Sequence, residues 1–274
     1  MTRPVMERPN LDKLLAPLKG FQRATVQRVF QRMYLDPEPT TRFLVADEVG
    51  LGKTLVARGV IAHVVNHLWD ERKHLNVLYI CSNQAIAAQN LSKLAIAEGQ
   101  RTAATRLTLL PRDIHHLREN KLNFISLTPG TALDLRSQGG RWEERLVLYR
   151  LLREILGDST ALQNMLQGDK GKDAWRYACT TDETALDASL AKLFKRAYGA
   201  PESAPIRKDV REGLELFSRQ RDKWSDEQRV KHARVVGALR TLLARTCADA
   251  LEPDLVILDE FQRFAQILHD ESDE

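Results

Sequence analysis

A glycine-rich turn at residues 46–54 constrains the fold of this chain more than any other segment. It reads Ala-Asp-Glu-Val-Gly-Leu-Gly-Lys-Thr and follows a short apolar run at residues 42–46. After it, apolar residues recur at helical spacing as far as residue 69. Glycines let successive backbone N–H groups converge on phosphate oxygens, and the start of a helix adds positive potential. The segment therefore predicts a phosphate-binding loop between a strand and a helix.

Individual residues of this loop have distinct expected roles. Gly50 and Gly52 allow the close backbone approach. Lys53 is expected to reach the β- and γ-phosphates, and the Thr54 hydroxyl to coordinate magnesium. The usual pattern has glycine five residues before Gly52, where this chain has Asp47. The alternative is a chance glycine-rich turn ahead of an exposed lysine, which the flanking strand and helix patterns disfavour.

A second candidate site follows the apolar run at residues 254–258, which leads into Asp259 and Glu260. In open α/β sheets, ligands bind at the carboxyl ends of the strands. We expect Asp259 to hold magnesium, directly or through water, and Glu260 to orient the attacking water. An acidic pair after a strand is also common as an exposed helix start. The phosphate loop in the same chain favours the catalytic interpretation.

The order of apolar patterns predicts the fold class. Strand, helix and strand in succession indicate an α/β fold with a parallel sheet, flanking helices and right-handed crossovers. Between residues 141 and 250 strand signals vanish and helical periodicity takes over, which predicts a helical insertion. The expected strands are residues 42–46, 76–81, 107–110, 123–127 and 254–258.

Charge is unevenly distributed along the chain. The formal net charge is +4, yet residues 250–274 hold eight carboxylates and one arginine, which leaves +11 on the remainder. A basic body suits a polyanionic partner because neutralised phosphates release counterions. The chain has no run of about 20 apolar residues that would cross a bilayer, and its first residues lack a signal-peptide pattern. We therefore expect a cytoplasmic protein without a membrane partner.

The glycine-rich turn resembles motif I of the Swi/Snf-type ATPases in helicase superfamily 2, relatives of the DEAD/DEAH-box helicases. In that family aspartate is the usual residue at the position of Asp47, so the departure from the strict pattern supports the resemblance. Further segments follow in the family's order. Residues 20–22 resemble the glutamine motif, 78–83 motif Ia, 126–130 motif Ib and 259–262 the Asp-Glu box.

The resemblance implies the first RecA-like lobe of a nucleic-acid-dependent ATPase, a helicase or translocase that uses ATP and Mg²⁺. It implies an arm with the glutamine motif at residues 1–41, a RecA-like ATP-binding lobe at residues 42–140 and 251–274, and a helical insertion at residues 141–250. The implied ATP contacts are Gln22, Asp47, Gly50, Leu51, Gly52, Lys53 and Thr54, with Lys53, Asp259 and Glu260 as catalytic residues and Thr54 and Asp259 as metal ligands.

The resemblance also implies specific recognition contacts. Gln22 is expected to recognise adenine. Ser82, Asn83, Thr128 and Gly130 are expected to lie along one strand of nucleic acid, DNA rather than RNA, and to contact its phosphates without reading sequence. Plainer alternatives exist, since Gln22 also fits an ordinary amphipathic helix start. Ser82 and Asn83 also fit the polar end of a strand.

Basic residues near the end of the insertion offer another candidate contact for nucleic acid. They are Lys231, Arg234, Arg240 and Arg245, which flank an apolar helix face. A solvated rim around a buried face is favoured over a DNA groove, because such charge patterns are common on ordinary surface helices.

Parts of the family pattern do not occur in this sequence. There is no second RecA-like lobe, whose arginines complete the ATP site, and no Ser-Ala-Thr motif III with its preceding strand. That strand normally lies between the phosphate-loop strand and the Asp-Glu strand, so we expect an incomplete sheet. We expect a fragment, a split protein whose second lobe is a separate chain, or a regulatory remnant, with negligible ATP turnover alone. The alternative function is a P-loop ATPase or remnant that acts on protein partners without translocation.

Overall fold

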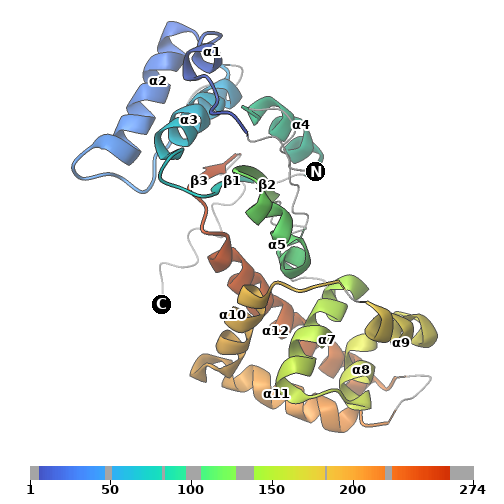
Figure 1. The fold of residues 1–274 in the computed structure, drawn as a ribbon. Helices are drawn as coiled ribbons and strands as arrows, with labels where there is room; N and C mark the ends of the chain where they lie inside the picture. The colour runs from blue at the N-terminus through green and yellow to red at the C-terminus, as the bar shows by residue number, and fades with distance from the viewer. Residues whose placement is uncertain are drawn as a thin grey trace. The chain divides into compact units, whose positions relative to one another are not determined.

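The computed structural model divides into two compact units (Figure 1). The first gathers the described residues of Met1–Thr105, Leu117–Pro129 and Pro253–Glu274, and the second those of Arg106–His116 and Gly130–Glu252. The N-terminal helices thus belong to the same unit as the strands. The structure describes residues 6–46, 51–81, 84–96, 106–127, 139–182, 184–219 and 224–259.

The first unit is built on a parallel three-stranded sheet in the order β2-β1-β3. The strands are β1 (Leu75–Ile80), β2 (Leu122–Leu127) and β3 (Leu255–Leu258). Ile80, the last residue of β1, pairs with the last residue of each neighbouring strand. The predicted α/β class with a parallel sheet flanked by helices is confirmed, and the carboxyl ends of the three strands meet at one edge.

Helices cover one face of this sheet (Figure 1). Successive strand residues alternate between faces, and the covered face presents mainly apolar side chains, among them Val77 of β1 and Phe124 of β2. These pack with apolar residues of the helices, which keeps both partners out of water. The helices are α1 (Leu11–Leu15), α2 (Gly20–Phe30), α3 (Lys53–Leu68) and α4 (Gln84–Leu94).

Asp254 fixes the start of β3 against β1. Its backbone N–H donates to the Asn76 carbonyl (2.9 Å), and its carboxylate accepts the Asn76 N–H (2.8 Å). Arg72 forms an ion pair with the same carboxylate at 3.2 Å. The Tyr34 hydroxyl donates to the Asp254 carbonyl at 2.7 Å. Burial, assisted by the Asp254 charge, raises the pKa of Tyr34 to about 12, so this donor keeps its proton.

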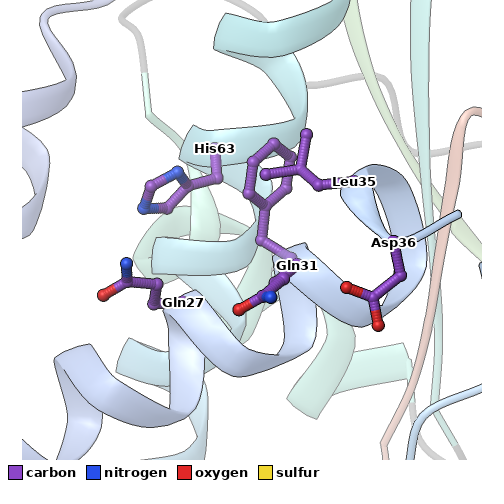
Figure 2. Close-up of a pocket in the computed structure, with 6 residues that line it drawn as sticks. Gln27, Gln31, Leu35, Asp36 and His63 are labelled. Atoms are coloured by element: carbon purple, nitrogen blue, oxygen red, sulfur yellow. The ribbon is translucent and has the colours of Figure 1, made fainter.

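A π-helical turn, η1 (Gln31–Leu35), extends α2 and carries Tyr34. The Phe30 ring stacks on His63 of α3 with ring centroids 4.9 Å apart. Burial lowers the pKa of His63. A surface cavity of about 360 Å³ lies here (Figure 2), and its lining includes none of the residues that the sequence predicts for ATP. The lining residues are Gln27, Phe30, Gln31, Leu35, Asp36 and His63.

Two predicted strands are wrong. Residues 107–110 form the short 3₁₀ turn η2 (Leu107–Leu109) and the start of α5 (Leu110–Glu119), because Leu107 and Leu110 are buried and a short apolar run does not by itself distinguish strand from helix. Residues 42–46 pair with none of the three strands and have no regular structure. An apolar run becomes a strand only where a neighbour accepts its hydrogen bonds.

The second unit is a bundle of helices (Figure 1). Its long helix α12 (Asp226–Leu251) packs against shorter helices from the preceding part of the chain. Ser225 begins α12 with a capping box to Gln228, in which each side chain binds the other residue's backbone N–H. The shorter helices are α7 (Trp142–Leu156), α8 (Thr160–Gln167), α9 (Lys172–Thr181), α10 (Ala188–Gly199) and α11 (Ala204–Leu216), with the 3₁₀ turn η3 (Pro201–Ser203) before α11.

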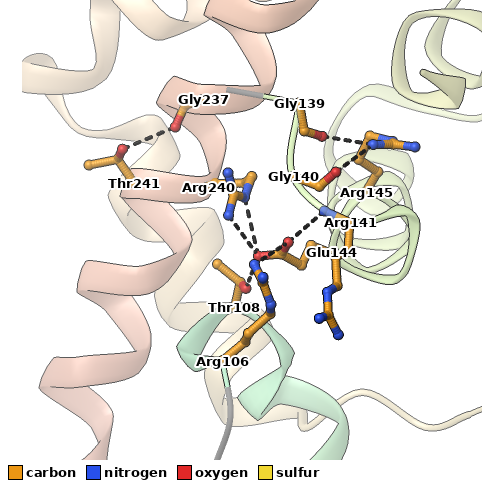
Figure 3. A network of polar contacts seen from close by, with 10 residues as sticks. All are labelled: Arg106, Thr108, Gly139, Gly140, Arg141, Glu144, Arg145, Gly237, Arg240 and Thr241. Carbon is orange, nitrogen blue, oxygen red and sulfur yellow. Dashed lines mark hydrogen bonds and ion pairs between the residues drawn. The ribbon is translucent and has the colours of Figure 1, made fainter. Parts of the chain in front are cut away.

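A buried carboxylate, Glu144 of α7, joins three parts of the bundle (Figure 3). It accepts hydrogen bonds from the Thr108 hydroxyl (2.5 Å) and the Arg141 backbone N–H (2.7 Å). Arg106 and Arg240 pair with it at 3.0 and 3.1 Å. Burial opposes its ionisation, but the hydrogen bonds and the two arginine charges together lower the pKa of Glu144 below its usual value. Glu144 is therefore charged in the folded bundle.

Replacing Glu144 by glutamine is expected to lower the free energy of unfolding of the bundle by about 3 kcal/mol, because Arg240 then keeps a buried charge without its carboxylate. Glu154→Gln is the matched control, since Glu154 lies on the same helix and is exposed. Urea unfolding at pH 7, followed by tryptophan fluorescence, measures both variants. Equal stability of the two would contradict the role assigned to the cluster.

Stability of the bundle should also fall in mild acid because of His232. Its Nδ1–H donates to the Met165 carbonyl at 2.7 Å. Burial, with the Arg145 charge, lowers the pKa of His232 from 6.5 to about 4, against the opposing effects of Met165 and Asp169. The unfolded chain binds a proton near pH 6.5 and the folded chain only near pH 4, so the stabilisation is complete above pH 6.5 and declines as the pH falls.

We expect a loss of about 1.4 kcal/mol per pH unit from this residue between pH 6.5 and pH 4. His232→Asn keeps an N–H donor but removes the titrating ring, so the stability difference between wild type and variant should shrink over this range. Urea unfolding at several pH values measures that difference. A difference independent of pH would show that His232 does not titrate as stated.

Candidate functional site

The start of α3 and the end of β3 lie at the same edge of the sheet. The end of α3 lies at the opposite edge, because Arg72, one turn after the helix, pairs with Asp254 at the start of β3. α3 has 16 residues, a length of about 24 Å, and packs along β1, a six-residue strand of about 20 Å. Its first residues, Lys53 and Thr54, therefore lie at the edge where β3 ends and Asp259 follows.

Gly52 begins α3 in a conformation that favours glycine. Its φ angle is +83°, and its carbonyl accepts the first helical hydrogen bonds, from Leu55 and Val56. A Cβ atom at this position would lie 2.6 Å from Nε2 of Gln22. The backbone angle favours glycine here, and a larger residue would also displace the Gln22 side chain. The structure thus supplies a glycine turn that leads into a helix with Lys53 and Thr54 in its first turn.

Gln22 of α2 holds the backbone of this turn. Its Nε2 donates to the Leu51 carbonyl at 2.9 Å, and its Oε1 accepts the Lys19 N–H at 2.9 Å. The side chain is only 4% exposed. The sequence predicts adenine recognition for Gln22, and the structure gives it a role that the motif did not reveal, the support of the glycine turn. The spacing of 29 residues between Gln22 and Leu51 is not a local signal that sequence could provide.

Asp259 is held at the end of β3 by contacts with β1 and α4. Its backbone N–H donates to the Ile80 carbonyl at 2.8 Å. Its Oδ2 accepts the Tyr79 hydroxyl at 2.6 Å and Nδ2 of Asn90 at 3.4 Å. Burial and the hydrogen bond to Asp259 raise the pKa of Tyr79, so the tyrosine remains a donor. The Asp-Glu motif predicted Asp259, but neither Tyr79 nor Asn90.

The donor set fits a nucleotide-bound magnesium ion. Among the described residues no group of three or more histidine, cysteine or acidic side chains could hold a metal. A magnesium ion bound to nucleotide needs no such group, because phosphates and water supply most of its ligands and the protein adds one or two. The Thr54 hydroxyl and the Asp259 carboxylate are suitable oxygen donors of this kind.

The remaining predicted site residues lie outside the described residues. β1 ends just before Cys81 and β2 ends at Leu127, and these ends are adjacent in the sheet register. The residues outside the described part are Asp47 and Gly50 of the loop, Glu260 of the acidic pair, and Ser82, Asn83, Thr128 and Gly130 of the expected nucleic-acid contacts.

The basic residues of α12 are mostly engaged within the bundle. Lys231 and Arg234 pair with Asp209 at 2.9 and 2.8 Å. Arg240 is 2% exposed and pairs with Glu144. These pairings favour the interpretation of this surface as an ordinary charged rim rather than a DNA groove.

Comparisons with known proteins give no relative for this chain. No protein-family model, curated protein or solved structure matches it. In the part of the chain that the structure describes, no helix is long and apolar enough to span a bilayer. The resemblance to helicase superfamily 2 therefore stays a prediction from the sequence motifs.

Proposed function

We propose that the first unit is the ATP-binding lobe of a nucleic-acid-dependent ATPase of the helicase or translocase type, with a RecA-like P-loop fold. The observation that carries this proposal is the shared edge of the sheet. There the Gly52 turn and Lys53 begin a long helix, and Asp259 follows a parallel strand. The N-terminus of a helix favours phosphate through its backbone N–H groups and positive potential, and a carboxylate at the same edge of the sheet favours a phosphate-bound cation.

Each residue then has a defined task. Lys53 binds the β- and γ-phosphates, Thr54 and Asp259 hold Mg²⁺, and Glu260 orients the attacking water. Bound Mg²⁺ supplies neutralisation of the phosphate charge. Gln22 contacts adenine and supports the turn, and its hydrogen bond to the Leu51 carbonyl at 2.9 Å favours the second of these tasks.

Nucleic acid is the proposed macromolecular partner, DNA rather than RNA. The residues that follow β1 and β2 continue from the edge that also holds Asp259. Ser82, Asn83, Thr128 and Gly130 would there contact phosphates of one strand. The charge of +11 outside residues 250–274 favours a polyanion. Binding at this edge would place the polymer next to the ATP site, as coupling between the two requires.

Hydrolysis is proposed to require a second RecA-like lobe, whose arginines complete the site. Among the described residues, β3 pairs only with β1, and residues 42–46 do not form a strand of the sheet. The 274-residue chain alone is accordingly proposed to bind ATP and turn it over negligibly.

Lys53→Ala is expected to weaken ATP binding by about 2 kcal/mol, roughly 30-fold, through loss of a charged hydrogen bond to phosphate. Lys73→Ala is the control, because Lys73 is exposed at the opposite edge of the sheet, two residues before the start of β1. Titrating ATP with Mg²⁺ by calorimetry, with and without single-stranded DNA or RNA, measures both affinity and coupling.

The wild-type chain should bind ATP more tightly when DNA is present, and DNA more tightly when ATP is present, by the same factor. Absence of ATP binding, or equal binding by the Lys53 and Lys73 variants, would overturn the proposal. ATP binding without any coupling to DNA or RNA would instead favour the alternative, an ATPase that acts on protein partners.

Gly52→Ala tests the glycine turn. The new methyl group would meet Gln22, and the left-handed backbone would be strained, so we expect a loss of about 1–2 kcal/mol in stability and weaker ATP binding. Gly20→Ala is the matched control, because it lies two residues before the same glutamine and a Cβ there meets nothing within 4 Å.

Gln22→Ala alone removes the hydrogen bonds to Leu51 and Lys19 and should also lower stability. The double variant lacks the clash, so its loss should be smaller than the sum of the two single losses. Thermal unfolding and ATP titration of the four variants measure these effects. Unchanged stability and ATP affinity in Gly52→Ala would show that the turn does not need glycine.

A further inference from the structure

A buried hydroxyl in β1 contacts the candidate magnesium ligand. Tyr79 is 2% exposed and lies on the helix-covered face of the sheet, in a core that is mainly apolar. Its ring packs there, but its hydroxyl reaches Oδ2 of Asp259 at 2.6 Å. Asn90 of α4 donates to the Tyr79 oxygen at 2.9 Å and to the same Asp259 oxygen at 3.4 Å. Side chains of two elements, β1 and α4, thus converge on one carboxylate oxygen.

We propose that Tyr79 is a positioning residue for the magnesium-binding carboxylate of Asp259, and that Asn90 in turn orients the Tyr79 hydroxyl. The inference rests on the proposed function, since it requires that Asp259 hold Mg²⁺ with bound ATP. Neither residue touches the nucleotide. Both act through the carboxylate.

The geometry explains why a donor is needed at this oxygen. The terminal torsion of aspartate is broad, so the plane of an unsupported carboxylate varies. Asp259 follows the last residue of a four-residue strand, and its backbone bond to Ile80 does not fix the side chain. Hydrogen-bond donors to one carboxylate oxygen restrict the orientation of the carboxylate plane. Partners of this kind contribute roughly 10- to 100-fold to metal affinity in other proteins.

A purely structural role predicts different behaviour. If Tyr79 only joined β1 to β3, removing its hydroxyl would lower stability and leave the effect of Mg²⁺ on ATP binding unchanged. A positioning role predicts a specific loss of that effect. The ratio of ATP affinities with Mg²⁺ and with EDTA separates the two roles, because the affinity without metal does not involve the orientation of the carboxylate.

The test is Tyr79→Phe, which removes one oxygen and keeps the ring. We expect the gain in ATP affinity on adding Mg²⁺ to fall about tenfold, with the affinity in EDTA unchanged. Tyr34→Phe is the matched control. It removes a hydroxyl of the same kind, bonded to Asp254 at the other end of β3, and should lower stability without changing the effect of Mg²⁺.

A double-mutant cycle with Asp259→Asn tests the route of action. If Tyr79 acts through Asp259, Tyr79→Phe will cause no further loss of the Mg²⁺ effect in the Asp259→Asn background. Asn90→Ala provides a second variant that leaves the tyrosine in place, with a smaller loss expected in the same direction. Thermal unfolding of every variant establishes that it is folded.

The outcomes distinguish this inference from the function on which it rests. A wild-type chain without Mg²⁺-dependent ATP binding would overturn both. A wild-type chain that shows such binding, with the same Mg²⁺ effect in Tyr79→Phe and Asn90→Ala, would overturn the positioning role alone. Additive losses in the cycle would also overturn it, because they would mean that Tyr79 acts independently of Asp259.

Discussion

The parallel pairing of β3 with β1 is the interaction on which the rest of the first unit depends. It joins residues almost 180 positions apart and brings Asp259 beside Tyr79. Closing so long a loop has an entropic cost, and β3 contributes only four residues to offset it. Polar contacts at both ends assist the pairing. Asp254 holds the first end through Asn76 and Arg72, and the Asp259 N–H holds the second.

Local sequence patterns predicted the parts of the fold that local physics determines. The apolar runs at 76–81, 123–127 and 254–258 are strands to within one or two residues, because each lies beside a strand that accepts its bonds. The runs at 42–46 and 107–110 have similar composition but pair with none of the described strands. Leu107 and Thr108 belong instead to a helical turn beside Glu144. A short apolar run indicates burial more reliably than it indicates conformation.

In the candidate site, too, some features have a signal in the sequence and others have none. The glycine turn before Lys53 and the carboxylate after β3 have motif signals, since backbone sterics and helix-end charge require those residue types at those positions. The bonds from Gln22 to Leu51 and from Tyr79 to Asp259 join distant segments, and no spacing rule encodes them. A partial signal did exist for Tyr79. A tyrosine within a mainly apolar strand needs a hydrogen-bond partner for its hydroxyl when it is buried.

The contacts that hold β3 in the sheet consequently also determine the position of the candidate site. Val256 and Leu258 are 47% and 38% exposed, so β3 gains little from apolar burial on that face. The strand is held by its hydrogen bonds to β1 and by the polar anchors at its ends. A carboxylate at the end of so short a strand is only as well placed as the strand itself. Contacts that fix Asp259 to Ile80 and Tyr79 therefore both retain β3 and orient the proposed metal ligand.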